Sequence, residues 1–128
     1  MNRVMFFSGI HGTGKSTTIE KIREVLGLEL FFSPDGDHGN PYKEPYQRQV
    51  WRLTKYYLDA FEILKKQEQT NSFLLVDRCV FDNEAYTSTF RLLDWISEEQ
   101  YQKINELRNV YFRDKEIQPQ NIILFSPP

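Results

Sequence analysis

Four short runs along the chain are rich in apolar residues and are separated by longer stretches of mixed character. They lie over residues 4–7, 28–32, 73–76 and 121–125, with Glu29 inside the second run and Asn121 at the start of the fourth. An unbroken apolar run of four or five residues, bounded by turn formers, is typical of a strand buried on both faces of a parallel sheet. The pattern therefore predicts four short strands.

The stretches between these runs predict helices over residues 15–26, 46–69 and 82–91, and another that begins at Ser97. The sequence Ser-Glu-Glu-Gln at residues 97–100 is a capping box, which starts a helix. Apolar residues recur every three or four positions and mark the buried face. The side chains expected to face inward are Ile19, Ile22, Val25 and Leu26, then Val50, Leu53, Tyr57, Ala60, Phe61 and Leu64, then Tyr101, Ile104, Leu107 and Tyr111.

Strands that alternate with helices indicate an α/β fold, with a mostly parallel sheet of about four strands between two helical layers. A chain of 128 residues is long enough for one such domain, over residues 1–128. Ligands of these sheets bind at the carboxyl ends of the strands. We therefore expect the functional residues directly after the predicted strands.

The composition of the chain limits the binding partners and the cellular compartment that can be expected. The formal net charge is -2, so no global basic field favours nucleic acid. No apolar run approaches the roughly 18 residues of a membrane span, and a single cysteine, Cys79, makes neither an internal disulfide nor a zinc site. We expect a cytoplasmic protein without membrane contact, whose aromatic-rich helices leave room for a homodimer face.

Residues 9–16 read GIHGTGKS and match G-x-x-x-x-G-K-[ST] at every fixed position, between a predicted strand and a predicted helix. Glycines let successive backbone N–H groups wrap a phosphate, and the helix N-terminus adds partial positive charge. Lys15 would reach the β- and γ-phosphates, and the Ser16 hydroxyl would bind Mg²⁺. The residues expected around the nucleotide are Gly9, His11, Gly12, Thr13, Gly14, Lys15, Ser16 and Thr17, although His11 fills a free position where a solvent-facing side chain is common.

Residues 76–87 read VDRCVFDNEAYT and follow the third predicted strand. Asp77 ends that strand, where a carboxylate meets Mg²⁺ directly or through water, and Arg78 places a cation beside the phosphates. Phosphoryl transfer relies on such positioning and charge neutralisation, so Lys15, Asp77 and Arg78 are the catalytic candidates. The other interpretation of Asp77 and Arg78 is an ion pair that caps a strand.

These two segments resemble the thymidylate kinase-like group of P-loop nucleotide and nucleoside kinases. The segment FSGIHGTGKST is similar to the group's first loop, and Asp77-Arg78 with Asn83, Ala85 and Tyr86 is similar to its D-R-x-x-x-S-N-x-A-Y-Q segment. The resemblance implies the three-layer αβα P-loop NTPase fold, with ATP as the expected donor (GTP is left open) and Mg²⁺ as cofactor. It also implies a nucleoside or nucleoside monophosphate as the small-molecule acceptor.

The resemblance assigns the acceptor side to Arg52, Asn83 and Tyr86, while Asp35 or Asp37 could be a general base for an acceptor hydroxyl. Each has a plainer interpretation: helix arginines are often only solvated, tyrosines often only pack, and acids are common in turns.

The sequence also departs from the group's pattern. Ser8 stands where the first strand of the group usually ends in an acid, Asp82 replaces the signature serine, and Thr87 replaces the glutamine. After the second strand, SPDGD replaces Arg-Glu-Pro or Glu-Pro. These changes place thymidylate itself in question as the acceptor.

Members of the group continue past the fourth strand into an arginine-bearing lid, a fifth strand and a final helix. We therefore expect this chain to be the N-terminal part of a longer family fold. Three alternatives remain open from the sequence: a P-loop kinase for a sugar, a P-loop kinase for a polynucleotide end, and a nucleotide-binding module without turnover. A signalling GTPase fits less well, because the chain has no N-K-x-D segment.

Overall fold

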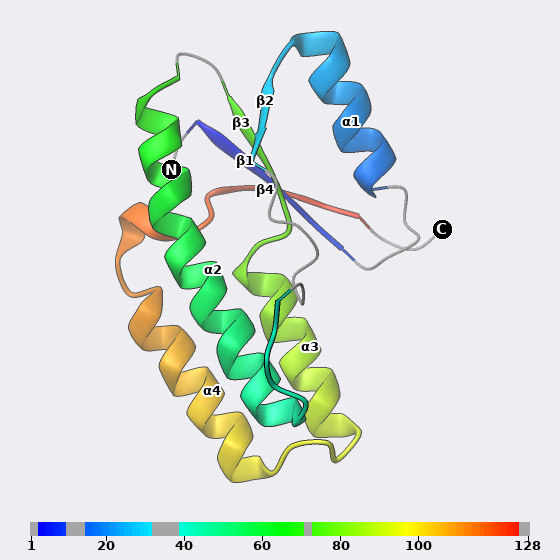
Figure 1. The fold of residues 1–128 in the computed structure, drawn as a ribbon, viewed down its shortest axis with the longest axis vertical. Coiled ribbons are helices and arrows are strands. Elements are labelled where there is room, and N and C mark those ends of the chain that lie inside the picture. The colour runs from blue at the N-terminus through cyan, green and yellow to red at the C-terminus, as the bar shows by residue number, and fades with distance from the viewer. Residues whose placement is uncertain (1–2, 10–14, 32–38, 71–72, 126–128) are drawn as a thin grey trace.

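The computed structural model describes residues 3–9, 15–31, 39–70 and 73–125, without the side chains of residues 16 and 29–31. Strands and helices follow in the predicted order (Figure 1). They are β1 (Val4–Ser8), α1 (Lys15–Leu26), β2 (Glu29–Phe31), α2 (Pro45–Glu68), β3 (Leu74–Asp77), α3 (Val80–Leu92), α4 (Glu98–Tyr111), a short 3-10 helix η1 (Lys115–Ile117) and β4 (Asn121–Leu124).

The four strands form one sheet in the order β2-β3-β1-β4, and every neighbouring pair is parallel. This confirms the predicted α/β class and the parallel sheet. Because β3 lies directly beside β1, with Phe7 opposite Asp77, the segments that follow these two strands leave the same edge of the sheet.

Helices cover both faces of the sheet, as predicted (Figure 1). On one face α1 packs its Ile19 against Phe7 and Leu75. On the other face α2 packs Ala60 and Ile63 against the opposite sides of the same strands. The alternation of neighbouring strand residues between the two faces explains why both central strands are apolar up to their last residues, Ser8 and Asp77.

Helices α2, α3 and α4 pack side by side and extend beyond the sheet (Figure 1). Their shared core contains Leu53, Val80, Ile96 and Ile104. The capping box predicted at Ser97 is confirmed, because the Ser97 hydroxyl accepts from the Gln100 N–H at 3.1 Å and the Gln100 side chain accepts from the Ser97 N–H at 3.0 Å.

Three expectations about burial were wrong. Val25 and Leu26 are 68% and 64% exposed, because they follow the part of α1 that packs on the sheet. Phe61 is 45% exposed at the margin of the buried stripe of α2, where its ring packs edge-on against Tyr57.

The last predicted strand is also less buried than expected. β4 pairs with β1 on one side only, and its residues are exposed, Leu124 by 71%. η1 was not predicted, and its Ile117 joins the core between α2 and the sheet.

Candidate functional site

The candidate site forms where the carboxyl ends of β1 and β3 meet. The Arg78 N–H donates to the Phe7 carbonyl at 2.7 Å, and the Phe125 N–H donates to the Ser8 carbonyl at 2.8 Å. Backbone hydrogen bonds therefore continue past the strand ends and hold three chain segments together. The structure brings the two sequence motifs to one place, as the sheet order requires.

Gly9 begins the phosphate-binding motif in a conformation that only glycine adopts readily. Its φ is +148°, and a Cβ at this position would lie 2.7 Å from the Phe125 carbonyl oxygen. Such a contact is too close for any side chain, and the backbone itself would be strained. The glycine is thus required by the close approach of the segment after β4.

Lys15 and Asp77 form a buried ion pair between the two motifs. Lys15 Nζ lies 3.0 Å from Asp77 Oδ1, and their side chains are only 5% and 17% exposed. The ammonium also donates to the Gly9 carbonyl at 3.3 Å. Taking both charges out of water is costly unless each is well paired, so the pair indicates a site prepared for charged chemistry.

Arg78 follows Asp77 with a φ of +76°, a left-handed conformation that is costly for a residue with a side chain. Strain of this kind is common at functional sites. The turn places Arg78 in the wall of a small cavity together with Arg52, Tyr56, Asn83 and Tyr86. The three predicted acceptor-side residues from α2 and α3 therefore converge on one cavity, which is called the acceptor cavity below.

Arg52 and Tyr86 also contact each other within this cavity. The Arg52 guanidinium carbon lies 5.9 Å from the centre of the Tyr86 ring, within the range of a cation–π interaction. Its Nη1 donates to Gln49 Oε1 at 3.4 Å. The Arg52 and Tyr86 side chains are thus held in place in the wall of the acceptor cavity.

Behind Asn83 lies a buried polar network that the sequence did not reveal. Gln49 Nε2 donates to Thr87 Oγ1 at 2.8 Å, and the Thr87 hydroxyl donates to the Asn83 carbonyl at 2.8 Å. From α4, Arg108 donates to Asn83 Oδ1 at 3.2 Å. No carboxylate of the described residues forms a salt bridge with Arg108, which is 7% exposed, and burial lowers the pKa of its guanidinium.

Arg108 fixes the orientation of the Asn83 amide. A guanidinium only donates hydrogen bonds, so the amide oxygen of Asn83 must face it. The amide nitrogen is then left buried and without a hydrogen-bond partner among the described residues. A buried donor of this kind is costly unless a ligand or water supplies an acceptor.

Like Arg108, Asp82 makes contacts that the sequence did not predict. Its Oδ1 accepts from the Ser8 hydroxyl at 3.0 Å and from the Gly9 N–H at 3.2 Å, and its Oδ2 accepts from the Cys79 N–H at 2.8 Å. The available signals were its place in the first turn of α3 and its departure from the serine of the segment that it resembles.

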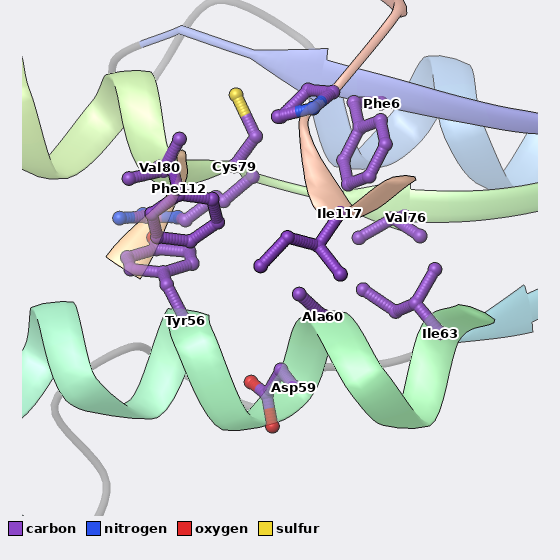
Figure 2. A pocket seen from close by; sticks show the side chains of 12 residues that line it. Phe6, Tyr56, Asp59, Ala60, Ile63, Val76, Cys79, Val80, Phe112 and Ile117 are labelled. Carbon is purple, nitrogen blue, oxygen red and sulfur yellow. The ribbon is translucent and has the colours of Figure 1, made fainter. Parts of the chain in front are cut away.

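A mostly apolar cavity lies beside the acceptor cavity, between α2 and the sheet (Figure 2). Phe6, Val76 and Ile117 line it, and Tyr56 and Arg78 are shared with the acceptor cavity. It belongs to the core, and burial raises the pKa of both Tyr56 and Cys79, the latter to about 11. The Cys79 thiol is therefore protonated near neutral pH and is not a nucleophile.

The remaining predicted site residues are placed only in part. Thr17 is exposed on α1. Asp35 and Asp37, the loop residues His11, Gly12, Thr13 and Gly14, and the side chain of Ser16 lie outside the described residues. Within the described part of the chain, no group of three or more His, Cys, Asp and Glu side chains could hold a metal ion. No helix there is long and apolar enough to cross a membrane.

Comparisons with known proteins found one curated relative and several similar solved structures. No family model matches the chain. It is 24% identical over 133 residues to a deoxyguanosine kinase of Dictyostelium discoideum, and the match covers 97% of this chain and 45% of that protein. The chain therefore spans less than half the length of this curated relative.

Two solved structures of a deoxyadenosine kinase from M. mycoides are similar to the chain. The structure with bound dATP has a TM-score of 0.70 and 21% identity, over 95% of this chain and 63% of that one. The structure with products dCMP and a flexible dCDP bound has a TM-score of 0.67 and 20% identity, over 94% and 62%. The P-loop fold predicted from the sequence is thereby confirmed.

Proposed function

We propose that the protein transfers the γ-phosphoryl group of a nucleoside triphosphate, with ATP as the expected donor, to the hydroxyl of a deoxynucleoside. The observation that carries this proposal is the buried Lys15–Asp77 pair at the joined ends of β1 and β3. It lies where a P-loop binds phosphates, and Arg78 connects it to the acceptor cavity. The resemblance to a deoxyguanosine kinase and the fold of a deoxyadenosine kinase support a deoxynucleoside as acceptor.

Each described residue has a distinct task in this scheme. Lys15 binds the β- and γ-phosphates and neutralises the charge that develops during transfer. Arg78, one residue after Asp77, binds phosphate oxygens between donor and acceptor. Arg52, Asn83 and Tyr86 orient the acceptor, whose base stacks on the Tyr86 ring.

The residues also fit magnesium, a cofactor that we include in the proposal. In phosphoryl-transfer sites Mg²⁺ is held by one or two carboxylates together with substrate phosphates and water. Asp77, at the end of β3, supplies one carboxylate, so no cluster of acids is needed. When bound, the ion would neutralise charge on the β- and γ-phosphates.

The test is a turnover assay with purified protein, Mg–ATP and a panel of deoxynucleosides, ribonucleosides, nucleoside monophosphates, sugars and polynucleotide ends. ADP release is followed for each acceptor. We expect turnover with one or a few deoxynucleosides, abolished by Lys15→Ala. Lys21→Ala, which removes an exposed lysine of the same helix, is the matched control.

Two other results would contradict the proposal. Nucleotide binding without turnover for any acceptor would identify a binding module. Turnover confined to a sugar or a polynucleotide end would identify another class of P-loop kinase.

A further inference from the structure

We infer that Asp82 is a positioning residue that sets the entry of the phosphate-binding segment against the Asp77–Arg78 turn. The inference rests on the proposed function, because it concerns how the same site is prepared for a nucleotide. It begins from a carboxylate that is 6% exposed and accepts three hydrogen bonds.

The three donors come from both motifs. Ser8 and Gly9 stand at the end of β1, where the phosphate-binding segment begins, and both bind Oδ1. The Cys79 N–H follows Arg78 directly and binds Oδ2. One side chain therefore links the segment that carries Gly9 to the segment that carries Asp77 and Arg78.

This link is independent of the Lys15–Asp77 pair. The lysine bridges the same two segments through flexible side-chain atoms, whereas Asp82 binds two backbone N–H groups and fixes the backbone itself. Hydrogen bonds to a carboxylate are about twice as strong as those between neutral groups. A Cβ on Gly9 would overlap the Phe125 carbonyl, so the Gly9 backbone packs closely against the segment after β4 and is also hydrogen-bonded to Asp82.

The two departures from the family pattern are also explained by this contact. The family has an acid at the end of the first strand and a serine in the second motif, whereas this chain has Ser8 and Asp82, which are hydrogen-bonded at 3.0 Å. In this chain the hydroxyl lies at the strand end and the acid lies in the second motif, and the two are in direct contact. The structure thus joins two departures that lie far apart in the sequence.

The first test replaces Asp82 by Asn, which has nearly the same shape but only one acceptor oxygen. In either orientation of the Asn amide, its NH₂ group faces a backbone N–H, that of Gly9 or that of Cys79. We expect the Kd of the non-hydrolysable analogue Mg–AMP-PNP, measured by calorimetry, to rise by about tenfold or more. Ser8→Ala should raise it by only about threefold, because the Gly9 N–H keeps its acceptor.

A matched control separates positioning from stability. Ile104→Val, in the core shared by α2, α3 and α4, makes none of the Asp82 contacts, so it is expected to lose about 1 kcal/mol of unfolding free energy and to leave the Kd within about twofold of the wild type. If Asp82→Asn lowered Tm but left the Kd equally unchanged, Asp82 would be a structural residue only and the inference would be wrong.

The second test exchanges the two residues. Ser8→Asp combined with Asp82→Ser should bind Mg–AMP-PNP more tightly than Ser8→Asp alone, because the pair removes the contact between two acids, but more weakly than the wild type, because the Gly9 and Cys79 N–H groups lose the Asp82 carboxylate. Additive effects of the two changes would contradict the inference.

The third test needs no nucleotide and so separates this inference from the proposed function. Amide hydrogen exchange at Gly9, followed by NMR, should be faster in Asp82→Asn than in the wild type and unchanged in Ile104→Val. If the wild type bound no nucleotide, the proposed function would fail while this result would still decide the role of Asp82. Equal protection of Gly9 in all three proteins would overturn it.

Discussion

The proposed donor end of the site, formed by Gly9, Lys15, Asp77 and Asp82, is built differently from the proposed acceptor cavity. At the donor end, the strand ends and their backbone hydrogen bonds hold the side chains in place. These side chains all come from residues within or next to the two motifs. The acceptor cavity is lined mainly by side chains from α2 and α3 and is supported by Arg108 from α4. The donor end therefore suits a chemical group common to all nucleotides, whereas the cavity can vary with the acceptor.

The largest expected effect is at the donor end. Asp77→Asn removes the charge that pairs with Lys15 and with the proposed magnesium. We expect kcat to fall by about 100-fold or more, as measured by ADP release. Asp59→Asn, which removes a carboxylate paired with Lys55 on α2, should change kcat by less than about twofold. A similar loss in both variants would show that the donor end has no special role.

The next effect concerns the backbone at the donor end. Gly9→Ala is expected to lower the unfolding free energy by about 2 to 3 kcal/mol, through strain and overlap with the Phe125 carbonyl, and to weaken ATP binding. Gly39→Ala tests strain alone, because Gly39 also has a positive φ but has nothing within 4 Å. It should cost about 1 kcal/mol in denaturant titrations, without loss of ATP binding. Equal losses in the two variants would contradict the close approach at Gly9.

A smaller effect is expected from the support of the acceptor cavity. Arg108→Met removes the donor that orients the Asn83 amide and lets that amide turn. The KM for the acceptor should rise by about tenfold, while the KM for ATP should change by less than about twofold. Lys103→Met, in the exposed face of the same helix, is the control. A parallel rise in both KM values would mean that the two sides of the site are not separable.

The smallest expected effect is on the pH dependence of stability and concerns Cys79, which directly follows Arg78 in the sequence. Burial raises the pKa of its thiol from 9.0 to about 11. Between pH 9 and pH 11 the unfolded thiol loses its proton while the native thiol keeps it, so stability is complete below pH 9 and falls as pH rises to 11.

The decrease should be on the order of 1 kcal/mol and should be smaller in Cys79→Ser, which does not titrate in this range. Denaturant titrations at pH 8.5 and 10.5 measure it, and the difference between the two proteins removes the contribution of tyrosines. Identical pH profiles would show that the native thiol is not protected by burial.

The sequence by itself determined the order of strands and helices, and it predicted which residues lie at the ends of β1 and β3. Short apolar runs bounded by turn formers are typical of strands in a parallel sheet, and the phosphate-loop motif places its glycines and lysine within eight residues. Lys15, Asp77 and Arg78 were therefore predicted as site residues from the motif and the strand end, and the structure brings Lys15 and Asp77 into contact. The prediction was wrong for Val25, Leu26 and Phe61, because periodicity gives the direction of a side chain but not whether another element covers it.

Only the tertiary structure decided which distant side chains meet. Gln49, Asn83 and Arg108 come from three helices, and the contacts among them depend on how those helices pack. The bond between Ser8 and Asp82 joins residues 74 positions apart. A hydrogen bond requires atoms to be within about 3 Å in the right orientation, and residue type alone does not specify that proximity. The packing of the helices against the sheet does.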